Sequence, residues 1–293
     1  MLHSPFRIAH LSDLHFYEFS WNPLQYFSKR IIGATNALLF RQFDFAPHKI
    51  ETLFELLGQE KIDHLILSGD LSTSSLRKEF RIAKQFLNRW CTSFDHTYII
   101  PGNHDHYTRK AHNKKIFYDY FPDSYSDISP YNLKNDGLNT VKLNEKWWLI
   151  LLDTTCYTPY FSSHGFFTPE LEDKLNITLS QIPKSDRVIL VNHFSCFNNE
   201  IRLVLKRSEA LRSLLQKHSI IKLYLNGHSH RQVIADLRAN NMPIILDSGS
   251  SSHKKEGSAF IIEIKSESMS IVPLKIKNDY SWQKNPPINF ILD

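Results

Sequence analysis

Histidine, aspartate and asparagine residues occur in five short clusters along the chain, and each cluster follows an apolar run. In chain order the clusters are Asp13 with His15, Asp70, Asn103 with His104 and Asp105, His193, and His228 with His230. Imidazole, carboxylate and amide oxygen without a thiolate suit borderline or hard divalent ions such as Mn, Fe or Zn. Two such ions about 3.5–4 Å apart need a ligand that bridges them. Asp70, alone at the end of its run, is the candidate for that bridge.

The placement of glycine supports a special role for these turns. The chain has only 9 glycines, where average usage predicts roughly 20. Three of them, Gly69, Gly102 and Gly227, stand directly beside the clusters. A missing side chain permits a sharp turn or a close approach of the backbone. We therefore expect tight turns at these three positions.

The first half of the chain predicts strands that deliver the polar residues to one place. Strands are expected at Phe6–Leu11, Asp63–Asp70 and Thr97–Ile100, and helices over Pro47–Lys61 and Thr73–Trp90, the latter capped near Thr73. Open α/β sheets place their binding sites at the C-terminal ends of parallel strands. The first three clusters are therefore expected to meet at one edge of a sheet.

The second half predicts further helices and then strands. Helices are expected over Lys110–Phe121, over Pro169–Ile182 with Thr168 as the cap, and over Ser208–His218, with a loop over Pro122–Gly137. Strands are expected at Asn139–Leu143, Lys146–Asp153, Arg187–Val191, Ile220–Leu225, Gln232–Asp236, Ile244–Asp247, Ala259–Ile264 and Met269–Pro273. The tail from Asn278 has no clear period. This order predicts a single α/β domain, 1–293, built as a layered sandwich of two sheets flanked by helices.

Composition indicates an ordinary globular protein. With 293 residues, 42% of them hydrophobic, and a formal charge of +5, the chain favours an anionic substrate or membrane face over a nucleic acid polymer. Three cysteines without a Cys-x-x-Cys pair make a disulfide framework and a thiolate zinc site improbable. The longest unbroken apolar run, Trp147–Leu152, is far below the roughly 18 residues that span a bilayer. A cytoplasmic location is therefore expected.

The ordered pattern D-x-H, G-D, G-N-H-D, H and G-H-x-H resembles that of calcineurin-like metallophosphoesterases, over roughly residues 6 to 250. The resemblance implies a four-layer α/β/β/α sandwich of two mixed sheets. It also implies two divalent metal ions, with Mn²⁺ expected first and Fe or Zn as alternatives. One ion would be held by Asp13, His15, Asp70 and His230, and the other by Asp70, Asn103, His193 and His228.

The same resemblance implies the remaining roles. A water made acidic by two cations attacks phosphorus in line with the leaving group. His104 is not a ligand in such enzymes; it donates a proton to the leaving oxygen or stabilises charge there, and Asp105 orients it. The other histidines of the region, His106, His112 and His164, are expected to be ordinary surface residues.

The segment 16–46, which follows the first cluster, distinguishes this chain. Between Trp21 and Phe43 it carries Lys29, Arg30 and Arg41 and no acidic residue, beside an apolar stripe of helical period. One interpretation is a lid that packs on the core. The other is a basic amphipathic helix at an anionic membrane surface, or one that grips an acyl chain.

The stretch Ser28–Arg41 resembles the segment K-R-hydrophobic-hydrophobic-G-x-x-N in a bacterial branch that includes UDP-2,3-diacylglucosamine pyrophosphohydrolases. The resemblance implies hydrolysis of that nucleotide-lipid to UMP and 2,3-diacylglucosamine 1-phosphate, for lipid A, on the cytosolic face of the inner membrane. The short form of that enzyme carries Arg where His104 stands here, so the similarity is to the long form. A cyclic nucleotide phosphodiesterase, a generic phosphodiesterase and a non-catalytic interaction module remain alternatives.

Overall fold

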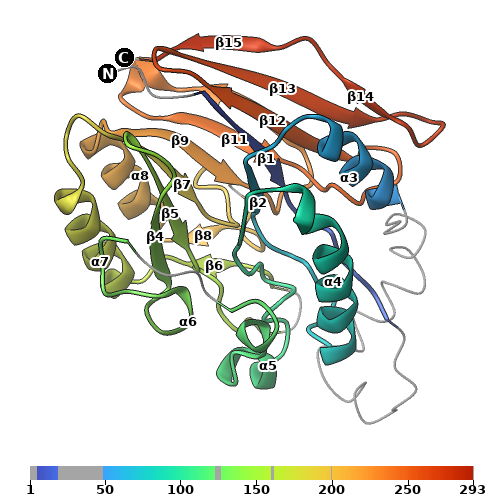
Figure 1. The fold of residues 1–293 in the computed structure, drawn as a ribbon. Coiled ribbons are helices and arrows are strands. Elements are labelled where there is room, and N and C mark those ends of the chain that lie inside the picture. Colours follow the sequence, from blue (N-terminus) through green and yellow to red (C-terminus); the bar gives the residue numbers. More distant parts are fainter. Residues whose placement is uncertain (1–4, 19–48, 123–126, 160–161, 199, 293) are drawn as a thin grey trace.

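The computed structural model describes residues 5–18, 49–122, 127–159, 162–198 and 200–292. Most of segment 16–46, with Lys29, Arg30 and Arg41, lies outside the described residues. In the described part, two mixed β-sheets pack face to face, with helices on the outer side of each (Figure 1). The predicted α/β sandwich of two mixed sheets is confirmed.

The first sheet combines the N-terminal strands with the C-terminal ones. Its order is β14 (Trp282–Lys284), β13 (Ser268–Ile276), β12 (Ser258–Ile264), β1 (Phe6–Leu11), β2 (His64–Leu67) and β3 (His96–Ile99), and β15 (Ile288–Ile291) also pairs with β13. Strands β1, β2 and β3 run parallel to one another, whereas β12 is antiparallel to β1. The three parallel strands therefore end at the same edge.

The second sheet carries the later clusters. Its order is β10 (Gln232–Asp236), β11 (Ile244–Ser248), β9 (Ile221–Asn226), β7 (Arg187–Val191), β5 (Trp147–Leu152) and β4 (Leu138–Lys142). Strands β11, β9, β7 and β5 are parallel, and the short strands β6 (Gly165–Phe166) and β8 (Leu205–Lys206) form a separate pair. The C-terminal ends of β7 and β9 again meet at one edge.

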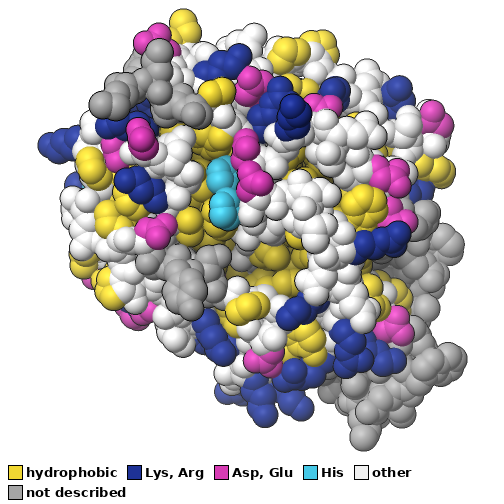
Figure 2. Space-filling model, viewed as in Figure 1, with side chains coloured by type: hydrophobic (Ala, Val, Ile, Leu, Met, Phe, Trp, Pro, Cys, Tyr) yellow, Lys and Arg dark blue, Asp and Glu magenta, His cyan; other side chains and the backbone are white. Residues whose placement is uncertain are grey.

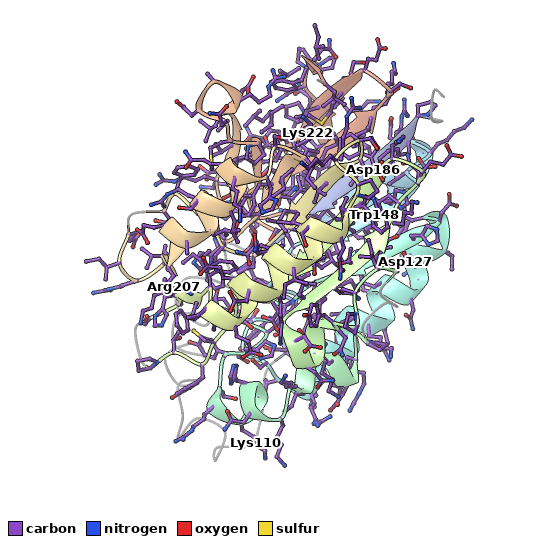
Figure 3. All side chains as sticks on the ribbon, turned by 90° about the vertical axis from the view of Figure 1, so that its left-hand side faces the viewer. Lys110, Asp127, Trp148, Asp186, Arg207 and Lys222 are labelled. Carbon is purple, nitrogen blue, oxygen red and sulfur yellow. The ribbon has the colours of Figure 1, made fainter. Side chains whose placement is uncertain are left out.

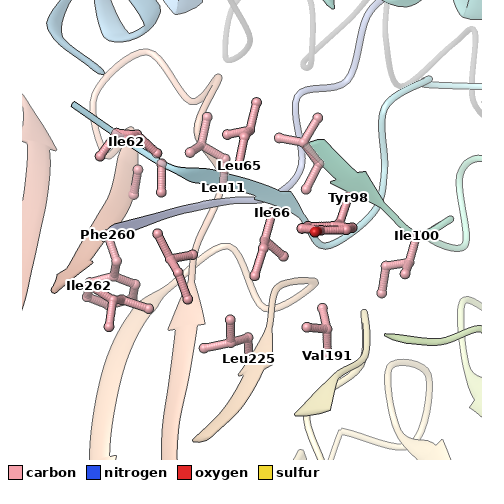
Figure 4. Close-up of a cluster of buried hydrophobic side chains, with 14 of the residues drawn as sticks. Leu11, Ile62, Leu65, Ile66, Tyr98, Ile100, Val191, Leu225, Phe260 and Ile262 are labelled. Carbon is pink, nitrogen blue, oxygen red and sulfur yellow. The ribbon is translucent and has the colours of Figure 1, made fainter. Parts of the chain in front are cut away.

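Two hydrophobic layers hold this arrangement together. Helices α3 (Ile50–Gln59) and α4 (Arg77–Trp90) cover the first sheet, and α7 (Pro169–Gln181) and α8 (Ser208–Lys217) cover the second (Figures 1 and 3). Between the sheets, Ile66 and Phe260 of the first face Val191 and Leu225 of the second (Figure 4). Burial of such side chains contributes roughly 1.5–3 kcal/mol each, so the facing strand ends have a rigid support.

The second predicted helix begins four residues later than expected. The carboxylate of Glu79 accepts hydrogen bonds from the backbone N–H groups of Ser74 and Leu76, at 2.9 and 3.0 Å, and these close the turn before α4. Thr73 does not cap the helix. Its hydroxyl donates to the carbonyl of His15 at 3.1 Å instead. By contrast, Thr168 caps α7 as predicted, by accepting from the N–H of Leu171.

Three other expectations about secondary structure were wrong. The helix predicted over Lys110–Phe121 is two short pieces, α5 (Arg109–Asn113) and a 3₁₀ turn at Ile116–Asp119, because Lys115 between them adopts φ +47°. The loop predicted before Gly137 contains the short helix α6 (Leu133–Asp136). The tail is not irregular either: β14 and β15 pair with β13, and Trp282 and Phe290 are buried.

Candidate metal centre

The five clusters meet where the C-terminal ends of both sheets face each other. Asp13 and His15 follow β1, Asp70 follows β2, His193 follows β7, and His228 and His230 follow β9. Two groups of potential metal ligands result. Within each group, the ligand atoms all lie within 4.8 Å of one another. The first group is Asp13, His15 and His230, and the second is Asp70, His193 and His228.

In the first group the ligand atoms already face one another. The Nε2 atom of His230 lies 3.0 Å from Oδ1 of Asp13 and 3.3 Å from Nε2 of His15. Asp13 and His15 are almost fully buried, whereas His230 is half-buried. Two imidazole nitrogens and one carboxylate oxygen thus surround one small space.

Asp70 stands between the two groups. Its Oδ2 atom lies 3.9 Å from Nε2 of His15 in the first group and 3.5 Å from Nε2 of His193 in the second. Its other oxygen, Oδ1, accepts a hydrogen bond from the backbone N–H of His104 at 2.7 Å. Asn103 joins the second group, since its Oδ1 lies 3.2 Å from Nε2 of His193.

These residues fit a pair of divalent metal ions. His228 is buried, and its Nε2 atom has no hydrogen-bond partner within the described part of the chain. Nδ1 of His193 donates to the carbonyl of Ser68 at 2.7 Å, which leaves Nε2 as a ligand atom turned to the centre. Nitrogen and oxygen atoms without sulfur match the set that Mn, Fe and Zn accept.

The backbone at the centre is held in an uncommon conformation. Five of the ligand residues have positive φ angles: Asp13, His15, Asp70, His228 and His230. Such left-handed conformations cost about 1–3 kcal/mol each outside glycine and persist only where the surroundings impose them. The strand ends are therefore fixed in the orientation that brings the ligands together.

The three glycines predicted to be special lie against the ligands. A Cβ atom on Gly102 would sit 2.2 Å from Oδ1 of Asp70, and one on Gly69 2.6 Å from Nδ1 of His193. A Cβ atom on Gly227 would sit 2.6 Å from Oδ2 of Asp13. The glycine positions thus provide the space that the ligand side chains occupy.

His104 lies beside the first group with a fixed ring orientation. Its Nδ1 atom donates to the carbonyl of Thr73 at 2.7 Å, and this bond fixes the orientation of the ring. Its ring stacks on Tyr107 with centroids 5.2 Å apart and meets the ring of His15 edge-on at 5.0 Å. The ring is thereby held from both sides.

The carboxylate of Asp105, predicted to orient His104, bonds to the backbone of two loops. This buried carboxylate accepts from the backbone N–H groups of Leu71, Ser72 and Gly102, at 2.8 to 3.1 Å. Because these residues lie in the loops after β2 and β3, Asp105 ties the two loops together. The carbonyl of Thr73 takes the orienting role on Nδ1 of His104.

The buried charges influence one another strongly. Burial lowers the pKa of His193, but the charges of Asp70 and Asp13 outweigh burial and raise it to about 9. Burial raises the pKa of Asp70, but His193 and His104 outweigh it and hold the pKa below its usual value. Burial lowers the pKa of His228 to about 3. At neutral pH the second group is therefore an ionised carboxylate, a protonated His193 and a neutral His228.

Some residues that shape the site were missed by sequence reasoning. The hydroxyls of Ser250 and Ser252 both donate to the carbonyl of Asp13 at 2.9 Å. The buried carboxylate of Asp247 accepts a hydrogen bond of 2.8 Å from the hydroxyl of Ser229. In the chain, Ser229 stands between His228 and His230. The available signal was a run of four serines and one glycine, 248–252, at the end of β11, a strand parallel to β9.

The prediction of surface histidines was wrong for His106. It is only 3% exposed and packs among the rings of His112, Phe117 and Tyr118. His112 and His164 are half-buried, and His164 pairs with the hydroxyl of Ser162 at 2.7 Å. Figure 2 shows histidine side chains on one face of the molecule, flanked by hydrophobic and acidic side chains.

Comparison with known proteins agrees with this centre. Residues 6–232 match the family model of the calcineurin-like phosphoesterases, and the chain belongs to that family. It is a metal-dependent phosphohydrolase of the kind that uses two divalent ions. Among the described residues, no helix is both long and apolar enough to cross a membrane.

The relatives span nearly the whole chain. A 3',5'-cyclic-nucleotide phosphodiesterase of Nostoc is 22% identical over 284 residues, which cover 95% of this chain and 90% of the relative. A dimetal phosphatase from Danio rerio shares the fold with a TM-score of 0.66 at 11% identity, covering 98% of this chain and 99% of that one. A purple acid phosphatase from yellow lupin has a TM-score of 0.62 at 11% identity, covering 99% of this chain and 54% of its own.

Proposed function

We propose that this protein hydrolyses phosphodiester bonds at the centre formed by the two ligand groups. The observation that carries the proposal is the position of Asp70, whose Oδ2 lies within 4 Å of a histidine from each group. A carboxylate in that position can bridge two ions. Bound ions supply a water of lowered pKa and stabilise charge on the phosphoryl oxygens.

Different residues of the protein bind the ions and donate the proton. Asp13, His15 and His230 would hold one ion, and Asn103, His193 and His228 would hold the other, with Asp70 shared. With its Nδ1 bonded to the carbonyl of Thr73, the doubly protonated ring of His104 donates the proton on Nε2 to the departing oxygen. Mn²⁺ is the ion we propose first, with Fe or Zn as alternatives that the same ligands accept.

The basic test uses purified protein with Mn²⁺ and bis(p-nitrophenyl) phosphate. Hydrolysis that stops on chelation and returns with Mn²⁺ supports the proposal. A non-catalytic interaction module would show no turnover with any of the three ions. An active wild type whose activity is lost in the Asp70→Ala variant excludes that alternative.

Two substrates deserve direct comparison. A 3',5'-cyclic nucleotide is favoured by the Nostoc relative, which aligns along nearly the entire chain. UDP-2,3-diacylglucosamine is favoured by the sequence of Ser28–Arg41, in the part outside the described residues. Offering both to the Mn²⁺-loaded enzyme separates them, because turnover of cyclic nucleotide without turnover of the nucleotide-lipid would reject the lipid A assignment.

The role of His104 gives a second distinction. A phosphate leaving group is a weak base and needs little protonation, whereas an alkoxide needs a proton. The His104→Ala variant should thus lose less activity on a pyrophosphate than on a cyclic diester. Equal losses would argue against proton donation by His104.

Attachment to the cytosolic face of the inner membrane is part of the same proposal. It rests on the cluster of Lys29, Arg30 and Arg41 beside apolar residues in the sequence. Co-sedimentation with anionic liposomes tests it, using wild type and a variant with these three residues neutralised. Equal sedimentation would favour the interpretation of the segment as a lid.

A further inference from the structure

A groove of about 510 Å³ opens beside the metal centre, on the face of the second sheet that also carries α7 and α8. Its volume falls in the range of about 300–1,000 Å³ that is typical of ligand pockets. One part of its lining is apolar and comes from β10, β11 and the segment after β7. The apolar residues are Phe197, Leu203, Val233, Ala235, Leu237 and Ile245.

The polar part of the groove adjoins the metal ligands. Ser229, which lines it, stands between His228 and His230 in the chain. The carboxylate of Asp247 accepts from the hydroxyl of Ser229 at 2.8 Å and from the side-chain amide of Asn226 at 2.7 Å. These polar groups bond to one another, so they form a closed end next to the centre.

The groove leads away from the metals along β10. Val233 pairs with Asp247 at the metal edge, and Ala235 pairs with Ile245, which lies farther from that edge. Alternate residues of a strand share a face, so Val233 and Ala235 of β10 lie in line, and Leu237, directly after the strand, continues the lining. Four residues of extended chain cover about 13 Å. The lining therefore changes from polar at the centre to apolar at a distance from it.

The apolar part is accessible to a ligand. Val233 is 43% exposed and Phe197 is 45% exposed. The ring of Phe197 is held in place by the guanidinium of Arg212, 5.5 Å from its centroid, and Arg212 donates to the carbonyl of Cys196 at 2.6 Å. A fixed, exposed aromatic ring in an apolar groove is typical of a binding surface.

We propose that this groove binds the hydrocarbon chain of an amphiphilic phosphodiester whose phosphate sits at the metal centre. The polar residues of the lining are Ser195, Asn198, Glu200, Asn226, Ser229, Arg231 and Asp247. Along the line of Val233, Ala235 and Leu237 no polar side chain is offered to a nucleobase, so this line fits a hydrocarbon better. The inference rests on the proposed phosphodiesterase function. It assigns to that function a substrate class, a diester with an alkyl or acyl chain on one side.

A graded series of n-alkyl p-nitrophenyl phosphates tests the inference, with ethyl, hexyl and decyl esters below their micelle concentrations. In each, the oxygen of water bonds to phosphorus, the bond to the aryl oxygen breaks, and p-nitrophenolate leaves with an alkyl phosphate as the other product. Each methylene that the groove buries should lower KM by up to about fourfold, the equivalent of about 0.8 kcal/mol.

Two variants locate the effect. Val233→Asp places a charge in the groove and should raise the decyl-to-ethyl ratio of KM values at least tenfold. Ala235→Leu fills the groove and should shift the preference to shorter chains. Ile177→Asp is the matched control. Ile177 on α7 is 46% exposed, an exposed fraction similar to that of Val233, and it does not line the groove.

Several outcomes would overturn the inference. KM values that do not change from ethyl to decyl exclude a hydrocarbon site, as does an equal effect of Val233→Asp and Ile177→Asp. If the ethyl ester is not hydrolysed at all, the proposed function fails separately. Calorimetric titration with decyl phosphate and ethyl phosphate then tests the groove alone, and equal affinities for the two exclude it.

Discussion

The two ligand groups share a bridging carboxylate but differ in their access to solvent. In the first, the side chain of His230 is 31% exposed, whereas the side chains of Asp70 and His193 in the second are each 1% exposed. The second group also contains His193. Burial lowers the pKa of this histidine, but the charge of Asp70 outweighs burial and raises the pKa to about 9. The first group is therefore open, and the second is closed and carries a proton that an ion must displace. We expect the ion of the first group to exchange faster.

Removing the shared ligand abolishes the difference between the groups. Asp70→Ala takes a carboxylate from both, so both ions should be lost, and kcat/KM should fall by more than the about 100-fold that loss of an outer-shell partner causes. Metal content per chain and hydrolysis of bis(p-nitrophenyl) phosphate measure the two effects. Asp119→Ala, which removes an exposed carboxylate paired with Arg77, should change neither. An Asp70→Ala protein that retains two ions would contradict the bridge.

A side chain that crowds Asp70 should reduce activity less than the removal of Asp70 does. In Gly102→Ala the new Cβ would lie 2.2 Å from Oδ1 of Asp70, so the carboxylate must move and activity should fall about 10–100-fold, as with lost outer-shell support. Gly58→Ala is the matched control. Gly58 lies in α3, with its nearest neighbour 3.9 Å from the new Cβ, and alanine there should stabilise the protein by about 1 kcal/mol. Equal activities of the two variants would show that the Gly102 turn tolerates a side chain.

The proton on His193 predicts a pH dependence for the closed group. Below about pH 9 the imidazole of His193 is protonated in the metal-free protein. Affinity for the second ion should therefore rise about tenfold for each pH unit up to that value and level off above it. Burial lowers the pKa of His15 in the first group, so that residue holds no proton for an ion to displace.

Calorimetry in buffers of different ionisation enthalpy measures this proton. At neutral pH, filling the second group should release about one proton per chain. The His193→Gln variant assigns the release, because it removes the titrating group. A release of the same size in that variant would place the proton elsewhere.

The difference between the groups also marks the limit of sequence reasoning. The candidate ligands could be picked out because Asp13, Asp70 and His193 each follow a buried strand, and a polar residue at such a place has a local signal. The burial of His106 had none, since it depends on rings that pack from η5, the 3₁₀ turn at Ile116–Asp119. The C-terminal strands β14 and β15 were missed because they are short and only Trp282 and Phe290 anchor them.

Most features of the site that were not predicted from the sequence are hydrogen bonds between residues far apart in the chain. Ser250 and Asp13 are 237 residues apart in the chain, yet the hydroxyl of one bonds to the carbonyl of the other. Thr73 was predicted as a helix cap, but in the folded chain its carbonyl orients His104, 31 residues away. Such contacts depend on how two sheets meet, which no local pattern encodes.

The serines behind Asp13 provide the most selective change to the open group. Ser250 and Ser252 both donate to its carbonyl, and Asp13 is held there at φ +56°. A buried hydrogen bond of this kind contributes about 1 kcal/mol, a factor of about five in an equilibrium constant. Ser250→Ala should therefore weaken the ion of the first group about fivefold and leave that of the second unchanged, in metal titrations of wild type and variant. Ser213→Ala on α8, which loses a hydroxyl bond to Glu209 at the surface, is the control. Equal weakening of both ions would mean that the two groups respond as one unit.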